Sequence, residues 1–346
     1  MPTRTIASYA SAPDMFGAAH ALFEAPAPAT AAAPAGESWK KVAEAIVNIF
    51  ETGSAMGNYS AITLIPHDSG HLTYGRSQTT LGSGNLFRLV DEYCLTPGAT
   101  FTRQLKPYLP RLQARDIALD TDIKLKNLLR ASADNPVMRS AQDEFFDRHY
   151  WQAAASEAAA AGVRCPLGVA AVYDSVVHGS WAAMRDRTNK ERGNLATLGE
   201  HAWIKAYLET RRTWLSTHPR PDIRMTGYRM DALLTLVSHE AWQLDMPLVV
   251  RGVEISAATL TGLPPGCYNG PAAGSRDLQV QSPLLRGADV RLLQLEIGTT
   301  ALPVNADGIY GPGTTDAFRR YQLQKGMAQS GIASRDFLSS LAQAYA

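Results

Sequence analysis

The chain has 346 residues, which is enough for two or three domains of ordinary size. Hydrophobic residues make up 45% of it and charged residues 19%, so a large core can be buried. Its 33 basic and 32 acidic side chains leave a net charge of +1, which excludes the strong basic excess of a dedicated nucleic-acid-binding protein.

The N-terminal segment, residues 1–37, is expected to be a lead and linker. Residues 25–37 are rich in alanine and proline, a composition typical of semi-rigid linkers. The first residues are interrupted at Pro13-Asp14 and do not resemble a Sec signal peptide. No apolar run approaches the roughly 18 residues of a membrane span. We therefore expect no membrane span, and a non-Sec export route if the protein acts outside the cytoplasm.

Cysteine and histidine spacing predicts neither a metal site nor a cofactor. The three cysteines are widely spaced, and either one disulfide or three thiols would fit: Cys94, Cys165 and Cys267. The eight histidines show no HExxH or comparable ligand spacing. A metal cluster of His67, His71 and His178 is the weaker alternative to turn, cleft-lining and helix-capping roles for these residues.

Ordered structure is expected to begin with a helix and a β-hairpin. Ser38 is a suitable N-cap, and apolar residues recur at helical spacing as far as Phe50, after which Gly53 ends the helix. Residues 60–78 alternate in polarity around the turn sequence His67-Asp68-Ser69-Gly70. This alternation about a turn predicts a hairpin.

Residues 85–250 are mostly helical in pattern. Helices are expected at 85–94, near 121–131, and at 140–160, 166–179 and 200–215. Glycine and proline residues between 262 and 282 break any regular element. The expected organisation is therefore a lead at 1–37, a main domain at 38–260, a linker at 261–282 and a C-terminal domain at 283–346.

Two carboxylic acids in contrasting settings form a candidate catalytic pair. Cleavage of a glycosidic bond needs one carboxyl that protonates the leaving oxygen and another that activates water or attacks the sugar carbon. The acid must hold its proton near neutral pH, which an apolar setting favours, and Glu51 directly follows Ile49 and Phe50. The base must be ionised and rigidly presented, as Asp68 would be in a turn. A solvated Glu51 and a turn-capping Asp68 are the ordinary alternatives.

The order of motifs over residues 38–255 resembles the chitosanases of glycoside hydrolase family 46. An acidic residue closes the first helix, and the hairpin aspartate lies seven residues before a glycine, with a threonine between them. The matching segments, in chain order, are Phe50-Glu51, Asp68 to Gly75, Asp134-Asn135-Pro136 with Arg139, Ala141-Gln142-Asp143 with Arg148, Tyr173 to Gly179, Leu208 to Arg212 and Tyr228 to Asp231.

This resemblance implies a mainly α (α+β) fold of the lysozyme superfamily, with two helical lobes, a cleft between them and one small β-hairpin. It also implies an inverting mechanism, with the carboxyls roughly 6.5–9.5 Å apart to leave room for a water. Carried over by motif, Glu51 becomes the acid, Asp68 the base, and Thr73 a hydroxyl that helps to hold the water. His71 and Tyr74, close to Thr73 on the same hairpin, are expected to contact the sugar.

One position departs from the family pattern. Chitosan is polycationic, and family members bind it with acidic cleft residues, one of which follows a Gly-Thr-Gly run. The corresponding run here is Gly82-Ser83-Gly84, and it is followed by the neutral Asn85. An amide keeps hydrogen bonding suited to hydroxyl or N-acetyl groups but lacks the charge that attracts an ammonium. Asn85 is therefore expected to bind an acetylated sugar.

Three charged residues of the 140–160 segment have two interpretations. Asp143, Asp147 and Arg148 lie on one expected helix and could support the catalytic carboxyls as a buried ion-pair network. A solvated helix face with i,i+4 pairs is the equally good alternative.

The C-terminal segment resembles the small three-helix peptidoglycan-binding domain type 1. The distinctive run is Asp307-Gly308-Ile309-Tyr310-Gly311-Pro312, in which Gly308 and Gly311 permit a tight turn. Thr314 or Thr315 is expected to cap the next helix, and Val290, Leu293 and Phe318 to form the core. Asp307 and Tyr310 are expected to contact the glycan or its peptide. Such a module raises the local concentration of a wall substrate.

The resemblances together imply an endo-acting, inverting β-1,4 glycoside hydrolase that cuts peptidoglycan strands, as a muramidase does. A chitosanase that carries a wall-anchoring module is the first alternative, and a non-catalytic wall-binding protein is the second. The expected site of action is the periplasm or cell wall of a target cell. An antibacterial effector with an immunity protein and a secretion-system partner, or a lysin, would fit this expectation.

Overall fold

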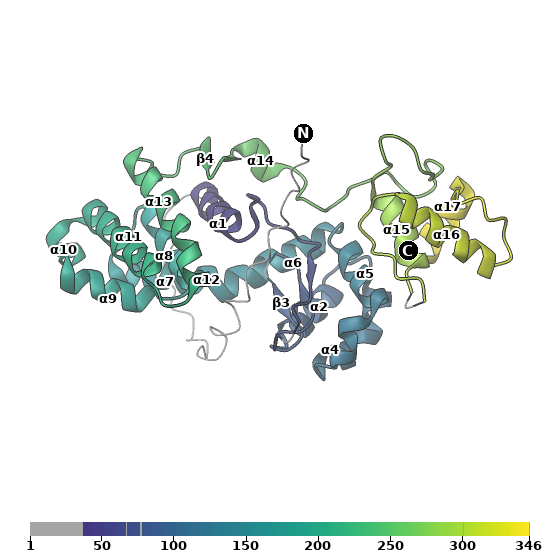
Figure 1. The fold of residues 1–346 in the computed structure, drawn as a ribbon, viewed down its shortest axis with the longest axis horizontal. Helices are drawn as coiled ribbons and strands as arrows, with labels where there is room; N and C mark the ends of the chain where they lie inside the picture. Colours follow the sequence, from purple (N-terminus) through teal and green to yellow (C-terminus); the bar gives the residue numbers. More distant parts are fainter. Residues whose placement is uncertain (1–36, 67, 77, 300, 346) are drawn as a thin grey trace, which may run out of the picture. The chain divides into compact units, whose positions relative to one another are not determined.

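The computed structural model describes residues 37–345 apart from 67, 77 and 300, and it is mainly helical, as expected (Figure 1). The chain forms two compact units. The first contains the described residues up to Phe50 and Tyr150–Ile255, and the second contains Glu51–His149 and Ser256–Ala346. These units cut across the domain boundaries expected near residues 260 and 283, because the C-terminal segment joins the unit that contains the hairpin.

The first unit is a helical bundle around α8 (Pro166–His178), which is buried on all sides. A helix that is apolar on every face must lie inside a protein, and α8 contacts α7, α9, α11 and α13. The remaining elements are η3 (Asp147–Trp151, a π-helical turn at the boundary), α7 (Gln152–Ala161), α9 (Trp181–Glu191), α10 (Leu195–Leu198), α11 (Glu200–Ser216), α12 (Pro221–Arg224), η4 (Met225–Gly227), α13 (Tyr228–Ser238), β4 (Leu248–Val250) and β5 (Val253–Ile255).

Helix α1 (Glu37–Thr52) leads from the first unit into the second. Its apolar residues Val42, Ile46, Ile49 and Phe50 are all buried, as their helical spacing predicts. The helix ends before Gly53, whose φ of +74° is the left-handed conformation of a helix stop. It already includes Ser38, so the expectation that Ser38 is the N-cap is wrong.

The hairpin of the second unit forms the first two strands of a three-stranded antiparallel sheet. Strand β1 (Ile62–Thr63) pairs with β2 (Thr73–Tyr74), and β2 pairs with β3 (Thr79–Thr80). The other helices and turns of this unit before its C-terminal part are α2 (Asn85–Leu95), α3 (Thr102–Leu105), η1 (Lys106–Tyr108), α4 (Leu109–Gln113), η2 (Ile117–Thr121), α5 (Ile123–Ser132), α6 (Pro136–Phe146) and α14 (Ala257–Thr261). The expected hairpin is confirmed; the third strand and the β4–β5 pair were not expected.

The C-terminal part of the second unit contains the expected three helices, α15 (Ala288–Ile297), α16 (Pro312–Gln324) and α17 (Arg335–Tyr345). Val290, Leu293 and Phe318 belong to their shared core, as predicted. Gly308 has a φ of +76°, which the tight turn requires. The capping role expected for two threonines is wrong, because α16 begins at Pro312 with Gly311 as N-cap and includes both: Thr314 and Thr315.

All three cysteines are buried free thiols. None of the helices in the described ranges is long and apolar enough to cross a lipid bilayer. Within the same ranges, no group of three or more His, Cys, Asp or Glu residues is arranged to hold a metal ion. His67, one member of the alternative metal cluster, lies outside the described residues.

Candidate functional site

The turn that carries Asp68 is held by its own hydrogen bonds and by a neighbouring loop. The Asp68 Oδ2 atom accepts a hydrogen bond from the Gly70 amide at 3.1 Å, which leaves Oδ1 for another partner. The Gly82 amide donates to the Gly70 carbonyl at 2.9 Å. A Cβ on Gly82 would lie 2.1 Å from the Ser69 carbonyl oxygen, so only glycine allows this approach. Asp68 therefore caps its turn and is rigidly presented.

Asp120, which no sequence motif singled out, holds the residues that follow this turn. Its Oδ2 atom lies 2.8 Å from His71 Nδ1, and its Oδ1 atom accepts a hydrogen bond from the Leu72 amide, also at 2.8 Å. His71 has a φ of +56°, which is costly for a residue with a side chain. The carboxylate compensates for this strain and orients an imidazole that stays 35% exposed.

The two expected site residues of strand β2 have different environments. Thr73 is half-buried, and its hydroxyl donates to the His71 carbonyl at 3.1 Å, so its oxygen is left as an acceptor. Tyr74 is 0% exposed, and its hydroxyl lies 3.2 Å from Ser132 Oγ in the lobe interior. The substrate contact expected for Tyr74 is therefore wrong, because strand alternation turns it into the core.

Asn85 is the first residue of α2, and the residue before it, Gly84, lies beside a guanidinium. Two hydrogen bonds to the Ser83 hydroxyl oxygen fix the preceding loop. The Asn85 amide donates to it at 3.2 Å, and the Thr80 hydroxyl donates to it at 2.7 Å. Arg115 packs against Gly84, since a Cβ there would lie 3.3 Å from Arg115 Nη2. Arg115 is exposed and forms no ion pair with any other described residue; its neighbour Asp116 pairs with Arg111 instead.

Glu51, half-buried at the end of α1, is followed by a segment that is anchored on α6. The buried Gln142 side chain donates to the Tyr59 carbonyl at 3.0 Å and accepts from the Arg76 amide at 3.0 Å. Asp143 accepts from the Tyr59 hydroxyl at 2.7 Å and pairs with the Arg76 guanidinium. The segment that leaves Glu51 is thereby joined both to α6 and to the turn after β2.

The expected network on the 140–160 segment divides between two partners. Asp143 is half-exposed but pairs with an Arg76 side chain that is only 4% exposed, so it is part of the support of the hairpin. Arg148 pairs at the surface with Glu92 at 2.5 Å. The solvated-face interpretation holds for Arg148, whereas Asp143 forms a half-exposed pair, and its support of the catalytic carboxyls stays a prediction.

In the first unit, three of the motifs that resemble the family meet at one carboxylate. Asp174 is fully buried and pairs with Arg211 at 2.6 Å and with Arg229 at 2.7 Å. Burial alone would raise the pKa of Asp174, but the two guanidiniums hold it below its ordinary value. Arg211 also donates to His178 Nδ1 at 3.0 Å, and burial together with the two cations lowers the pKa of His178 to about 3. His178 is therefore a neutral structural acceptor at the end of α8.

The two residues expected to contact ligand in the C-terminal module serve its fold. Tyr310 is 0% exposed, and its hydroxyl donates to the Gly331 carbonyl at 2.7 Å, so the expected ligand contact is wrong. Asp307 is exposed, but its Oδ1 atom accepts from Gln294 at 2.8 Å and from the Ile309 amide at 2.9 Å. Its other carboxylate oxygen is the part that can meet a ligand.

Comparisons with known proteins show which families the two parts of the chain match. The family model of glycosyl hydrolase family 46 matches residues 45–248, and that of a peptidoglycan binding domain matches residues 286–341. A chitosanase of Bacillus subtilis (strain 168) is 30% identical over an alignment of 241 residues, and the match covers 64% of this chain and 85% of the relative. The crystal structure of native chitosanase from Bacillus subtilis MY002 is 27% identical with a TM-score of 0.50, covering 62% of this chain and 95% of that one. A mutant of that chitosanase complexed with 6 GlcN gives the same values.

Proposed function

This chain belongs to glycosyl hydrolase family 46 and is a glycoside hydrolase, and we propose that its substrate is the glycan strand of peptidoglycan. The observation that carries this proposal is the charge beside the loop that contacts the Asp68 turn. The loop that contacts the Asp68 turn ends in the neutral Asn85, and the exposed guanidinium of Arg115 packs against that loop. An arginine at this position repels the ammonium groups of chitosan and attracts the carboxylates of muramic acid and of the stem peptide.

The peptidoglycan binding domain supports the same substrate. A catalytic unit that carries such a module meets wall polymer at a raised local concentration. The near-neutral net charge of +1 also lacks the acidic excess that would concentrate a polycation.

In the proposed reaction, the Glu51 carboxyl gives its proton to the glycosidic oxygen as the bond to the anomeric carbon breaks. The Asp68 carboxylate takes a proton from a water that attacks the opposite face of the sugar, so the products are a free hydroxyl and an inverted hemiacetal. The Thr73 oxygen, whose own proton is engaged by the His71 carbonyl, accepts a hydrogen bond from that water. The net change is addition of one water across one β-1,4 bond.

Hydrolysis of chitosan is the second candidate, and the curated and structural relatives favour it because each is described as a chitosanase. The two functions are separated by measuring new reducing ends on purified sacculi and on soluble chitosan with the same enzyme preparation. Mass spectrometry of the sacculus products would identify the cleaved bond. We expect release of muropeptide-bearing fragments from sacculi; activity on chitosan alone would overturn the proposal.

A peptidoglycan substrate requires action outside the cytoplasm. We therefore propose the periplasm or wall of a target cell as the site of action, and an antibacterial role with a neutralising immunity partner. Expression with an added periplasmic signal is expected to lyse cells, and the Glu51→Gln variant targeted in the same way is the control. Equal growth of both strains would contradict this part of the proposal while leaving the in vitro specificity intact.

A further inference from the structure

We infer that the C-terminal three-helix module (residues 278–345) is docked on the small lobe (residues 53–149) as one folded body, and that the segment between them is a clamp rather than a flexible tether. Both parts belong to the second compact unit. Four sets of contacts join them.

The first set of contacts is apolar. Leu295 of α15 is 0% exposed and belongs to the core of the small lobe, together with residues of α2, α5 and α6. Leu292, one turn earlier on the same helix, packs against both the lobe core and the core of the module. The two cores are therefore continuous through one face of α15, which only a docked module allows.

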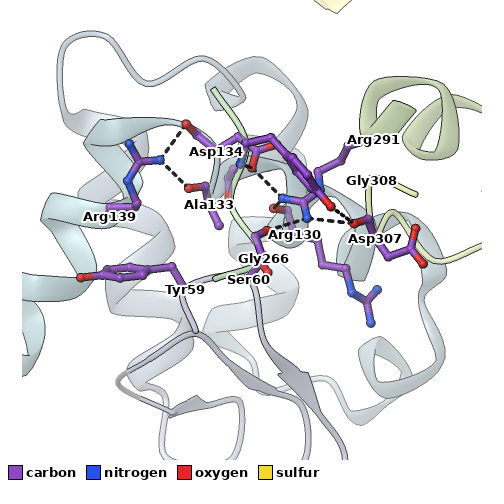
Figure 2. A network of polar contacts seen from close by, with 12 residues as sticks. Tyr59, Ser60, Arg130, Ala133, Asp134, Arg139, Gly266, Arg291, Asp307 and Gly308 are labelled. Carbon is purple, nitrogen blue, oxygen red and sulfur yellow. Dashed lines mark hydrogen bonds and ion pairs between the residues drawn. The ribbon is translucent and has the colours of Figure 1, made fainter. Parts of the chain in front are cut away.

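The second set is a buried ion pair. Arg291 of α15 is 2% exposed and donates to Asp134 at 2.6 Å. The same guanidinium donates to the Gly266 carbonyl at 2.7 Å and to the Arg130 carbonyl at 3.1 Å, as Figure 2 shows for the surrounding network. A charge that is removed from water persists only when it is paired and hydrogen-bonded, and here the partners come from the lobe and from the connecting segment.

The third set consists of hydrogen bonds between a buried side-chain amide and a loop of the module. Asn127 of α5 is 0% exposed; it donates to the Val304 carbonyl at 2.7 Å and accepts from the Ala306 amide at 2.9 Å. These backbone groups belong to the loop between α15 and α16. Without docking, this amide and both backbone groups would need water, so the loop and α5 are interdependent.

The fourth set lies at the end of the chain. Lys124 of α5 donates to the Leu295 carbonyl at 2.8 Å and to the Tyr345 hydroxyl at 2.6 Å. Arg103 of α3 donates to the Ala344 carbonyl. The last turn of α17 is thereby attached to two helices of the lobe.

The connecting segment itself is held by the same groups. The Tyr268 amide donates to Asp134 at 2.7 Å, and Cys267 is buried against Tyr59 and Ala133. The Tyr268 ring fills the space above Gly308, where a Cβ would lie 2.2 Å from it. The glycine- and proline-rich segment is therefore tightly packed where it crosses from the small lobe to the module. The module presents any wall polymer it binds at a fixed distance from Asp68, a consequence that rests on the proposed function.

The docking itself is tested without any substrate, in the full chain, by amide hydrogen exchange and calorimetry of Arg291→Met. We expect exchange to rise about tenfold or more in both α15 and α5 (Ile123–Ser132), because opening the interface exposes the two together. The unfolding midpoint of the second unit should fall by several degrees. The matched control is Arg319→Met, whose ion pair with Asp316 lies at the surface of the module and should leave exchange in α5 unchanged.

Lys124→Met provides a milder variant if Arg291→Met does not fold. It removes two interface hydrogen bonds without leaving a buried charge unpaired, and the increase in exchange should again appear on both sides. An increase confined to the module, with α5 as protected as in the wild type, would overturn docking in favour of a tether. That outcome would leave the substrate assignment untouched, because neither variant changes a residue that the proposed reaction uses.

Discussion

The carboxylate of Asp174 and the guanidinium of Arg211 are both 0% exposed and meet at 2.6 Å between Oδ2 and Nη1. Arg229, only 2% exposed, occupies the other carboxylate oxygen at 2.7 Å. Helices α8, α11 and α13 contribute one residue each, so this single carboxylate joins three helices of the first unit.

Replacement of Asp174 by Ala is expected to lower the free energy of unfolding by about 3–5 kcal/mol, because two buried guanidiniums lose their counter-charge. Urea unfolding followed by circular dichroism measures this loss. The matched control is Asp231→Ala, which breaks a surface pair with Arg212 whose side chains are 53% and 55% exposed, and which should change stability little. Equal losses in the two variants would contradict the structural role of Asp174.

The buried His178 predicts an acid-dependent loss of stability. Its pKa is about 3 in the folded chain and 6.5 ordinarily, so between these values the unfolded chain binds a proton that the folded chain does not. The stabilising contribution is thus complete above pH 6.5 and is lost as the pH falls toward 3. Asp174 contributes in the same direction only below its ordinary value of 3.8. The two windows are therefore separable.

This prediction is measured by urea unfolding at pH 7 and pH 4.5. The wild type should lose about 2 kcal/mol more than His178→Gln between these two values, since one pKa unit corresponds to about 1.4 kcal/mol. If the two proteins lose stability in parallel, His178 does not carry the dependence.

The contact between Asp120 and His71 predicts a positioning role for Asp120. Asp120→Ala should reduce kcat by about 10- to 100-fold with a smaller effect on KM, because the loop after Asp68 loses two hydrogen bonds that hold its strained backbone. Asp120→Asn keeps an acceptor for the Leu72 amide and should recover part of the activity. Asp116→Ala, on the same surface segment, is the control and should be nearly as active as the wild type.

The assignment of Glu51 and Asp68 predicts that each amide variant is folded but inactive. Glu51→Gln and Asp68→Asn should each lower turnover by about 100-fold or more, with unchanged melting temperature and unchanged binding to sacculi. Glu144→Gln, an exposed glutamate on α6, is the control. Retention of near-wild-type turnover by either variant would remove that residue from the mechanism.

The positive charge of Arg115 is expected to favour sacculi over chitosan as the substrate. Arg115→Gln should lower the activity on sacculi several-fold, and Arg115→Glu should lower it further while raising any activity on chitosan, because the sign of the local charge is reversed. Arg187→Gln makes the same charge change at an exposed site of the first unit. If Arg115→Gln and Arg187→Gln behave alike on both polymers, the charge beside Asn85 does not select the substrate.

The periodicity of apolar residues and short turn motifs were sufficient to predict most of the helices and the hairpin from the sequence. The apolar spacing of Val42, Ile46, Ile49 and Phe50 predicts the buried face of α1, and the turn sequence around Asp68 predicts the pairing of β1 with β2, because both signals are local. Motif order also identified Asp174 and Arg211 as parts of the family pattern. It could not show that they pair, since they are 37 positions apart in the chain.

What only the tertiary structure decided concerns side-chain direction and long-range contact. Tyr74 and Tyr310 lie within recognised motifs, yet both point into cores, because packing rather than motif membership determines which face a residue presents. Asp120 and Arg115 carry no motif and acquire their roles through residues more than 30 positions away.

The proposed catalytic pair, Glu51 and Asp68, was predicted from residues that are local in the sequence together with the resemblance to the family, and it stays a prediction. An apolar helix end and a polar turn are properties of a few neighbouring residues, and elementary chemistry assigns an acid to the first setting and a base to the second. The linker expected at residues 261–282 shows the opposite case. Its composition indicates a tether, but Arg291 and Asp134 hold it as a packed crossing, because buried charges must find partners wherever the fold brings them.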